Sequence, residues 1–456
     1  MRPFSPALFT DLYELTMAQA YFEEGMSGEG TFSLFVRRLP KRRNYLIACG
    51  LDDVLTFLEE FRFDQSALTY LDSLKRFSGR FLHYLERLRF TGDVYAIAEG
   101  TPVFANEPIL EVVAPIAEGQ LVEAFVMNQT HLQTVLASKA ARIVEAAQGR
   151  QVVDFGMRRI HGTDAALKAA RAFHIAGVHA TSNVAAGQAY GLRVSGTMAH
   201  SYIQAHDDEL DAFRAFARQY PDTVLLVDTY DTLSGVHKVI DLARALGPEF
   251  RVSAVRLDSG DLLDLSIRTR RMLDEAGLRS VGVFASSSLD ENAITDLIAA
   301  GAPIDGFGIG TEMGVAPDAP MLDIAYKLVE YAGRGRIKLS TGKSLLPGRK
   351  QVFRVEHQAV AERDVIACHD EPAHGRPLLQ KVMSKGARLP AGRVALDEAR
   401  ARRQDELSRL PAALRSMSPA DPPYAVEISP RLAAETERLR KHHDSAPEPL
   451  ANTRSM

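Results

Sequence analysis

The sequence has only two cysteines, Cys49 and Cys368, among its 456 residues. Two cysteines are too few for a disulfide framework or for a zinc site built on thiolates, so we expect free thiols. The sequence also lacks an apolar run long enough to cross a bilayer. Asp11 and Glu14 interrupt the N-terminal segment, which therefore does not resemble a signal peptide. We expect a cytoplasmic protein with no membrane partner.

Neither sign of charge dominates the chain. The formal net charge is −4, which gives no general attraction to nucleic acid, and no nucleic-acid partner is expected. Hydrophobic residues make up 46% and charged residues 25%, a composition typical of a globular protein with a large core. The length of 456 residues predicts two or three domains.

The first part of the chain mixes helical and strand patterns. Residues 11–25 carry apolar side chains at helical spacing, and residues 31–36 alternate as in a half-buried strand. The basic run at 37–43 indicates either a solvated loop or a loop that faces phosphate. We expect an N-terminal α+β domain over residues 1–120.

Short apolar strands then alternate with helical segments, and nearly every strand is followed by polar residues. Seven such strand ends lead to residues 158–159, 181–183, 197–201, 228–231, 256–261, 285–288 and 308–311. Repeated strand–helix units predict a parallel sheet. Seven units favour an irregular, TIM-like α/β barrel over residues 121–340, with its functional groups at the carboxyl ends of the strands. A doubly wound sheet is the alternative, but its glycine-rich loop would follow the first strand rather than the last.

The barrel pattern stops near residue 340. Residues 341–456 are expected to form a C-terminal extension that packs back on the N-terminal domain. The last ~12 residues are expected to be disordered.

His200 is the first candidate for chemistry, because it follows a predicted strand at Val194 and a break at Gly196. It could be a histidine of the core, a nucleophile toward a phosphoryl group, or a general acid or base. A metal site with His206 and Asp207 is a further alternative.

Other strand ends indicate ligands rich in phosphate and hydroxyl groups. The turn at 258–261 and the carboxylates of Asp228 and Asp231 suit ribose hydroxyls or a Mg²⁺ held with substrate phosphates. Some of these aspartates could instead only cap helices. The glycines of 306–310 allow backbone amides to approach a phosphate. Arg158, Arg159 and Arg256 together suit a small anion.

Five motifs occur in the order found in one family. They are TDLYELTM at 10–17, DFGMRR at 154–159, GTMAHS at 196–201, VRLDSGD at 255–261 and GIGT at 308–311. The chain resembles nicotinate phosphoribosyltransferase over about residues 6 to 354, and its last hundred residues resemble the family less distinctly. Some members carry a C-terminal cysteine cluster, which this chain lacks.

The resemblance implies a reaction and an assembly. Nicotinate and phosphoribosyl pyrophosphate would give nicotinate mononucleotide and pyrophosphate, while ATP is hydrolysed to ADP and phosphate, as the first step of NAD salvage from nicotinate. Mg²⁺ would be the cofactor and ATP a co-substrate. The family also implies an irregular barrel and a homodimer with shared active sites.

The resemblance also implies the role of each matched residue. His200 would be phosphorylated by ATP, and Asp258 would face the ribose or Mg²⁺. Nicotinate would be bound by Tyr13, Thr197, Arg256 and Arg158, with Tyr13 reaching in from the other subunit. The phosphoribosyl group would be held by Gly308, Gly310, Thr311, Ser259 and Gly260.

Three other functions compete with this one. A nicotinamide phosphoribosyltransferase would differ only in the ring substrate. A non-catalytic barrel that binds sugar phosphates would not need His200, Arg256 and Asp258 together. An aldolase-like enzyme would need a lysine at a strand end, and none of the seven strand ends has one.

Overall fold

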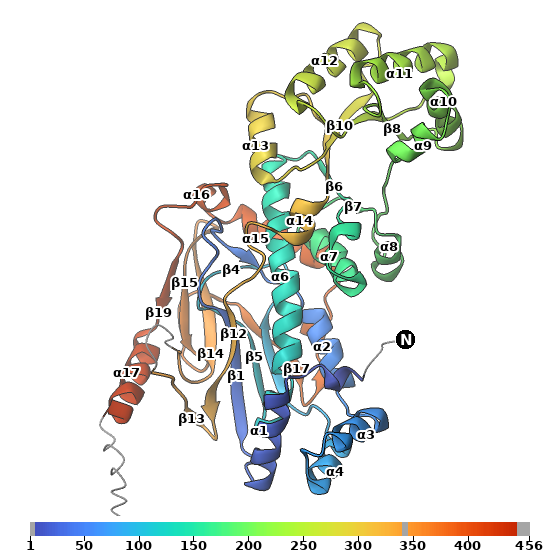
Figure 1. Ribbon diagram of the computed structural model, residues 1–456. Coiled ribbons are helices and arrows are strands. Elements are labelled where there is room, and N and C mark those ends of the chain that lie inside the picture. The colour runs from blue at the N-terminus through green and yellow to red at the C-terminus, as the bar shows by residue number, and fades with distance from the viewer. Residues whose placement is uncertain (1–4, 340–344, 445–456) are drawn as a thin grey trace, which may run out of the picture.

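The computed structural model describes residues 5–339 and 345–444, which form a mixed α/β protein with two main sheets. A curled parallel sheet and its helices lie at the top of Figure 1, and an antiparallel body lies below them. Helix α6, Glu123–Ala146, runs from one to the other. The predicted disordered end, 445–456, lies outside the described residues.

The antiparallel body is built on a seven-stranded sheet in the order β13-β12-β1-β5-β3-β17-β18. Its central strands, β1 at Glu29–Val36 and β5 at Pro108–Pro115, are buried along nearly their whole length. The others are β3 (Asp93–Ile97), β12 (Ile324–Tyr331), β13 (Arg334–Gly335), β17 (Leu379–Ser384) and β18 (Ala387–Arg388). Strands β12 and β17 come from late in the chain, so this sheet joins residues that are distant in sequence.

The two faces of this sheet belong to different apolar cores, as the period of two in a strand requires. Phe32 and Leu34 of β1 join the helices in one core, whereas Phe35 lies in a smaller cluster on the other face. The helices on the first face are α1 (Leu12–Glu23), α2 (Leu51–Glu60), α3 (Gln65–Ser73), α4 (Gly79–Arg87) and α5 (Ile116–Leu121).

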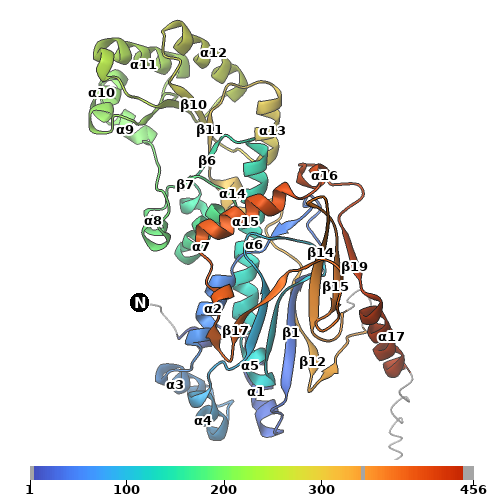
Figure 2. The ribbon, with the colours of Figure 1, turned by 180° about the vertical axis from the view of Figure 1, so that it is seen from behind.

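Residues from the C-terminal part of the chain form a smaller, four-stranded sheet beside it, in the order β16-β14-β15-β19. These strands are β14, Lys350–His357, β15, Val360–Cys368, β16, Arg376–Pro377, and β19, Ala425–Ile428. The helices of this region are α15, Leu396–Ser408, α16, Ala412–Arg415, and α17, Pro430–Asp444. Figure 2 shows α15 crossing in front of α6, and α15 packs against α7, Thr163–Ile175. A short pair, β2 at Leu46–Ile47 and β4 at Pro102–Val103, completes the body.

The parallel sheet has six strands in the order β7-β6-β11-β10-β9-β8. They are β6 (Gln151–Asp154), β7 (Ala180–Thr181), β8 (Val224–Leu226), β9 (Ala254–Leu257), β10 (Gly282–Ser286) and β11 (Gly306–Ile309). Read as a circle, this order follows the chain from β6 round to β11, as in a barrel. Among the described residues no ladder joins β7 to β8, so the sheet is a curled half-barrel with one open seam.

The open seam corrects one prediction from the sequence. The expected strand at Val194 is reduced to an isolated bridge with Thr181. Val194 is 46% exposed, and among the described residues its one strand partner is Thr181, so the segment gains neither a full ladder nor a core contact for this side chain.

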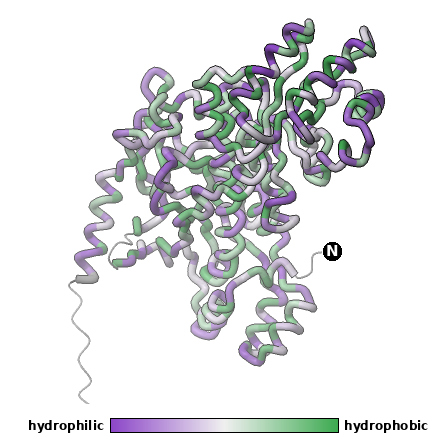
Figure 3. The backbone as a smooth tube through the Cα atoms, turned by 45° about the horizontal axis from the view of Figure 1, so that its top comes forward, coloured by the Kyte–Doolittle hydropathy of each residue, from purple (hydrophilic) through white to green (hydrophobic). Residues whose placement is uncertain are grey.

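Some of the helices between the strands have an aspartate N-cap, which decides between the two interpretations of Asp231 and Asp261. The helices are α8 (Val184–Tyr190), α9 (His200–Gln204), α10 (Glu209–Gln219), α11 (Thr232–Leu246), α12 (Leu262–Glu275), α13 (Glu291–Ala299) and α14 (Thr311–Val315). Asp231 and Asp261 accept hydrogen bonds from first-turn amides of α11 and α12, so both are N-caps. The peripheral helices alternate between apolar and polar residues (Figure 3), as expected for helices with one face on a core.

Buried ion pairs hold α6 against the parallel unit. Lys139 Nζ lies 2.6 Å from Glu291 Oε2, and Arg142 Nε lies 3.1 Å from Glu291 Oε1. Arg43 and Lys139 also pair with Asp318, at 2.7 and 2.9 Å. The charges can be buried because each has a partner.

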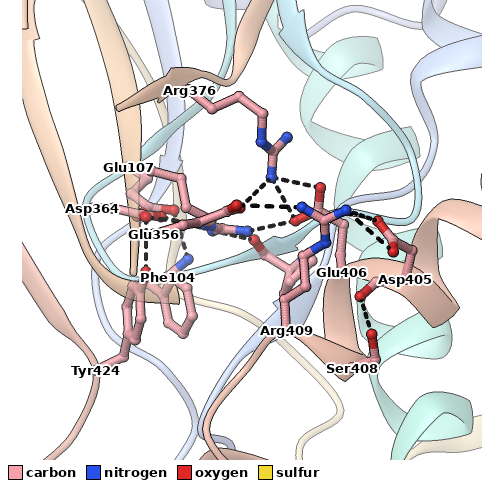
Figure 4. Close-up of polar contacts among 12 residues, drawn as sticks. Phe104, Glu107, Glu356, Asp364, Arg376, Asp405, Glu406, Ser408, Arg409 and Tyr424 are labelled. Atoms are coloured by element: carbon pink, nitrogen blue, oxygen red, sulfur yellow. Dashed lines mark hydrogen bonds and ion pairs between the residues drawn. The ribbon is translucent and has the colours of Figure 1, made fainter. Parts of the chain in front are cut away.

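A second buried network holds the C-terminal sheet to α15 and β4. Arg354 donates to Asp364 at 2.7 Å, to Glu406 at 3.1 Å and to the carbonyl of Pro102 at 2.9 Å. Figure 4 shows Glu406 of α15 also meeting Arg376, at 2.7 Å. Burial, and then the neighbouring Asp364, raise the pKa of Glu107 well above its ordinary value.

We predict that Asp364→Asn destabilises the protein. Arg354 and Asp364 are 1% and 0% exposed, and removal of the Asp364 charge leaves Arg354 with Glu406 as its remaining carboxylate partner, at a cost of about 2 kcal/mol for the lost charged hydrogen bonds. Urea unfolding followed by circular dichroism measures the change. The control is Asp222→Asn, which breaks an exposed pair with Arg251 and should leave the unfolding midpoint unchanged. Equal effects of the two substitutions would contradict the account.

Candidate active site

Four of the predicted residues form one chain of contacts at the carboxyl edge of the parallel sheet. His200 Nε2 lies 3.6 Å from Asp258 Oδ2, and Arg256 Nη2 lies 3.9 Å from the same oxygen. Arg256 Nη1 donates to Thr197 Oγ1. The residues come from the end of β9 and from the segment that leads into α9, so the parallel sheet brings them together.

Arg256 is a guanidinium fixed in a half-buried position. It lies over the ring of Phe155, 5.9 Å from the ring centroid, and its Nε is buried with no hydrogen-bond partner within the described structure. Burial lowers the pKa of Arg256. The negative charges of Asp258 and Asp228 raise this pKa, and the nearby positive charge of Arg158 lowers it further. A cation held in this way is suited to an anionic ligand that supplies the missing acceptor.

His200 begins α9 and has a defined partner on each side of its ring. Its Nδ1 lies 3.2 Å from Thr229 Oγ1, and its Nε2 faces Asp258. The side chain is 39% exposed, so the ring is accessible to a ligand. An accessible imidazole oriented by a hydroxyl and a carboxylate is suited to nucleophilic or acid–base chemistry.

Asp228, at the end of β8, orders the turn that carries Asp258. Its Oδ2 accepts hydrogen bonds from Asp258 N at 3.0 Å and from Ser259 Oγ at 2.5 Å. Its Oδ1 is buried and has no protein partner in the described part of the chain. Gly260 completes the turn with φ +78°, a backbone conformation that favours glycine.

The glycines after β11 serve packing as well as access. A Cβ at Gly308 would lie 2.4 Å from the ring of Phe155, so glycine is required there for Phe155 to lie beneath Arg256. Gly310 precedes α14, and its Cβ would meet only the carbonyl of Phe155, at 3.4 Å. Thr311 is the exposed first residue of α14. The steric explanation therefore accounts for Gly308, and Gly310 and Thr311 remain free to approach a ligand.

Tyr13 and Arg158 lie differently with respect to this cluster. Arg158 is exposed in the short 3-10 turn Met157–Arg159, close enough to affect Arg256. Tyr13 is 46% exposed at the start of α1, in the antiparallel body, whereas α9 lies in the parallel unit (Figure 1). One chain thus brings Arg158 to the cluster but does not bring Tyr13 to it.

The basic run at 37–43 is largely occupied by protein carboxylates. Arg37 and Arg38 both pair with Asp323, at 2.9 and 3.1 Å. Arg43 is buried against Asp318. These three arginines therefore serve structure within the described residues, and the interpretation of a phosphate-facing loop is not needed for them.

Two family models match the chain. The N-terminal domain of nicotinate phosphoribosyltransferase matches residues 8–130, and the nicotinate phosphoribosyltransferase family model matches residues 150–338. The chain is 56% identical over 440 residues to the nicotinate phosphoribosyltransferase pncB2 of Mycobacterium tuberculosis, covering 96% of this chain and 95% of that protein. It is 44% identical over 386 residues to nicotinate phosphoribosyltransferase of Bacillus subtilis, covering 82% and 79%. The chain belongs to the nicotinate phosphoribosyltransferase family.

A solved structure supports the same relationship. The crystal structure of human nicotinic acid phosphoribosyltransferase superposes with a TM-score of 0.84 at 28% sequence identity, covering 94% of this chain and 99% of that chain. No helix among the described residues has both the length and the apolar character needed to span a bilayer.

The carboxylates at the site are compatible with the Mg²⁺ expected in a nicotinate phosphoribosyltransferase. The described residues contain no group of three or more His, Cys, Asp or Glu side chains that could hold a metal ion. Mg²⁺, however, is often held by one or two carboxylates together with waters and substrate phosphates. The unpartnered Oδ1 of Asp228, next to Asp258, fits an ion that arrives with its substrate.

Some residues at the site were not singled out by the sequence. Thr229 contacts His200, the ring of Phe155 lies beneath Arg256, and Ser286 donates to Asp258. All three follow or end strands of the parallel sheet, and this position was the only signal in the sequence that could have identified them.

Glu14, next to Tyr13, is a buried carboxyl group with a raised pKa. The residue is 0% exposed, and burial raises its pKa to about 7. A hydrogen bond from Thr10 lowers the pKa, whereas the negative charges of Glu123 and Asp11 raise it. Since the folded state holds a proton that the unfolded state releases above about pH 4.5, stability falls as pH rises from about 4.5 to 7.

We predict that Glu14→Gln removes this loss. The variant should gain stability relative to the wild type as pH rises, with a melting temperature about 2 °C higher at pH 8 and a smaller difference at pH 5. Thermal unfolding at the two pH values measures the effect, with Glu24→Gln, an exposed position next to the same helix, as the control. A difference that stays constant with pH would show that Glu14 is not protonated in the folded state.

Proposed function

We propose that the chain catalyses ATP-coupled transfer of a phosphoribosyl group to nicotinate. The products are nicotinate mononucleotide, pyrophosphate, ADP and phosphate, and the reaction begins NAD salvage from nicotinate. The observation that supports this most is the contact chain from His200 through Asp258 to Arg256 and Thr197, in a chain of this family. It supports the proposal because His200 and Arg256, the residues proposed to accept the phosphoryl group and to bind the carboxylate, both lie close to Asp258.

Arg256 and Thr197 bind the nicotinate carboxylate in this proposal. Arg256 has a free, buried Nε, and Thr197 Oγ1 accepts from its Nη1, so the two present a fixed polar surface. Arg158 adds a second positive charge nearby. A carboxylate gains more from such cations than a neutral amide does, which favours nicotinate over nicotinamide.

His200 accepts the γ-phosphoryl group of ATP. An imidazole nitrogen attacks the γ-phosphorus, the bond to the ADP oxygen breaks, and water later receives the phosphoryl group as phosphate. Thr229 and Asp258 hold the two ring nitrogens in a defined orientation, which lowers the entropic cost of the attack.

The sugar-phosphate side of the site lies around Asp258. The bond from C1 of the ribose to pyrophosphate breaks and the pyridine nitrogen forms the new bond, through a cationic sugar that a nearby carboxylate stabilises. The 5′-phosphate is bound by Gly308, Gly310, Thr311, Ser259 and Gly260. Bound Mg²⁺, held by Asp258 and Asp228, would neutralise charge on the pyrophosphate as it leaves.

The functional unit is a homodimer in the cytoplasm. Tyr13 is exposed and remote from His200 in its own chain, so it is free to stack on the pyridine ring in the site of a second copy. The strand ends of the curled parallel sheet would supply the rest of each site.

Comparison of the two ring substrates tests the proposal. Purified protein with phosphoribosyl pyrophosphate, Mg²⁺ and ATP should form mononucleotide from nicotinate and far less from nicotinamide. The reverse preference would establish a nicotinamide phosphoribosyltransferase. No product from either ring, with folded protein, would favour a non-catalytic barrel that binds sugar phosphates.

We predict that His200→Ala abolishes ATP coupling but keeps some transfer. Phosphorylation assists the reaction, whereas attack of the ring on the sugar needs no imidazole, so ATP-dependent turnover should fall about 100-fold or more. ADP and mononucleotide are measured together. His237→Ala, at an exposed histidine of α11, is the control. A variant that still consumes ATP in proportion to product would refute the role of His200.

We predict that Arg256→Ala raises the KM for nicotinate about 10- to 100-fold, as expected for the loss of a charge-assisted hydrogen bond. The KM for phosphoribosyl pyrophosphate should change less than about threefold. Steady-state kinetics with each substrate varied in turn measures both. Equal increases in the two KM values would count against a contact with the nicotinate carboxylate.

A further inference from the structure

Ser286 contacts the central carboxylate of the site from its buried side. It is the last residue of β10 and is 3% exposed. Its hydroxyl donates to Asp258 Oδ1 at 2.5 Å. The other oxygen of Asp258 is the one that faces His200 and Arg256. The two oxygens of this carboxylate therefore have separate partners.

The backbone beneath Asp258 is fixed independently. Asp258 N donates to Asp228 Oδ2, so the carboxylate group is the part of the residue that still requires orientation. Rotation about the bond to the carboxylate would exchange its oxygens, and the hydrogen bond from Ser286 opposes that rotation. Strand β10 lies next to β9 in the sheet, with Ala285 opposite Leu257, which brings Ser286 level with Asp258.

We infer that Ser286 is a positioning residue that links ATP use to phosphoribosyl transfer. This rests on the proposed function. By fixing Asp258, Ser286 keeps one carboxylate oxygen within 3.6 Å of the histidine and 3.9 Å of the arginine at the same time. The phosphoryl side and the nicotinate side of the site thus share one carboxylate oxygen, and the hydroxyl of Ser286 holds it between them.

The backbone after Ser286 is consistent with a constrained position. Ser287 has φ +126°, in a region that residues other than glycine seldom occupy. Such conformations persist where the surrounding structure enforces them, and they are concentrated at functional sites.

The test compares Ser286→Ala with Ser286→Thr, which keeps a hydroxyl on a β-branched side chain suited to a strand. Ser286→Ala should lower the ATP-dependent kcat about tenfold, leave the KM for nicotinate within about twofold, and raise the amount of ADP formed per mononucleotide. Ser286→Thr should restore most of kcat and the wild-type ratio. Ser253→Ala is the control. Ser253 precedes β9, at the end of that strand opposite Asp258, and its hydroxyl donates to the backbone carbonyls of Asp222 and Thr223.

A double-mutant cycle tests whether Ser286 acts through Asp258. In an Asp258→Asn background, Ser286→Ala should change kcat less than about twofold. The same tenfold loss in both backgrounds, or no loss in the wild-type background, would overturn the inference. A melting temperature of Ser286→Ala far below that of Ser286→Thr, with kcat per folded molecule unchanged, would also overturn it. A wild-type protein that forms no mononucleotide would instead overturn the proposed function before any variant is compared.

Discussion

The fixed carboxylate of Asp258 is the constraint on which the site depends. Its backbone amide is bound by Asp228 and one of its oxygens by Ser286, so the remaining oxygen has one direction in which to point. These three residues stand at the ends of β8, β9 and β10, which are neighbours in the parallel sheet. The register of that sheet therefore sets the orientation of the carboxylate that faces His200 and Arg256.

The sheet itself is held in place by buried charge rather than by apolar packing alone. Glu291, at the start of α13, pairs with Lys139 and Arg142 in the C-terminal half of α6. A second network around Arg354 joins the C-terminal sheet to α15, which in turn packs against α7. Because an unpaired buried charge is costly, these networks permit few alternative arrangements of the parallel unit on the antiparallel body.

Local sequence patterns predicted the parts of the fold that depend on local rules. Buried strands alternating with helices indicated the parallel sheet, and polar residues after the strands indicated the edge where His200, Arg256 and Asp258 meet. The cap positions of Asp231 and Asp261 could be anticipated in the same way, since an aspartate before an amphipathic segment is a common N-cap.

The features that sequence reasoning missed depend on pairings between distant residues. A return of residues 341–456 to the N-terminal domain was expected, but the ladders by which β17 joins β3 and β12 joins β1 leave no local pattern. The contact between Ser286 and Asp258 follows from the register of β10 on β9. Val194 was predicted as part of a strand from a single β-branched residue, and one such residue does not determine whether a partner strand reaches it.

The most direct test of the account is to follow a labelled γ-phosphoryl group from ATP onto the protein. We predict an acid-labile phosphoryl group on the peptide that contains His200. Addition of nicotinate and phosphoribosyl pyrophosphate should release this group as phosphate, in step with the formation of mononucleotide. Mononucleotide formed at full rate with ATP, while no phosphoryl group is found on His200 at any time, would contradict it.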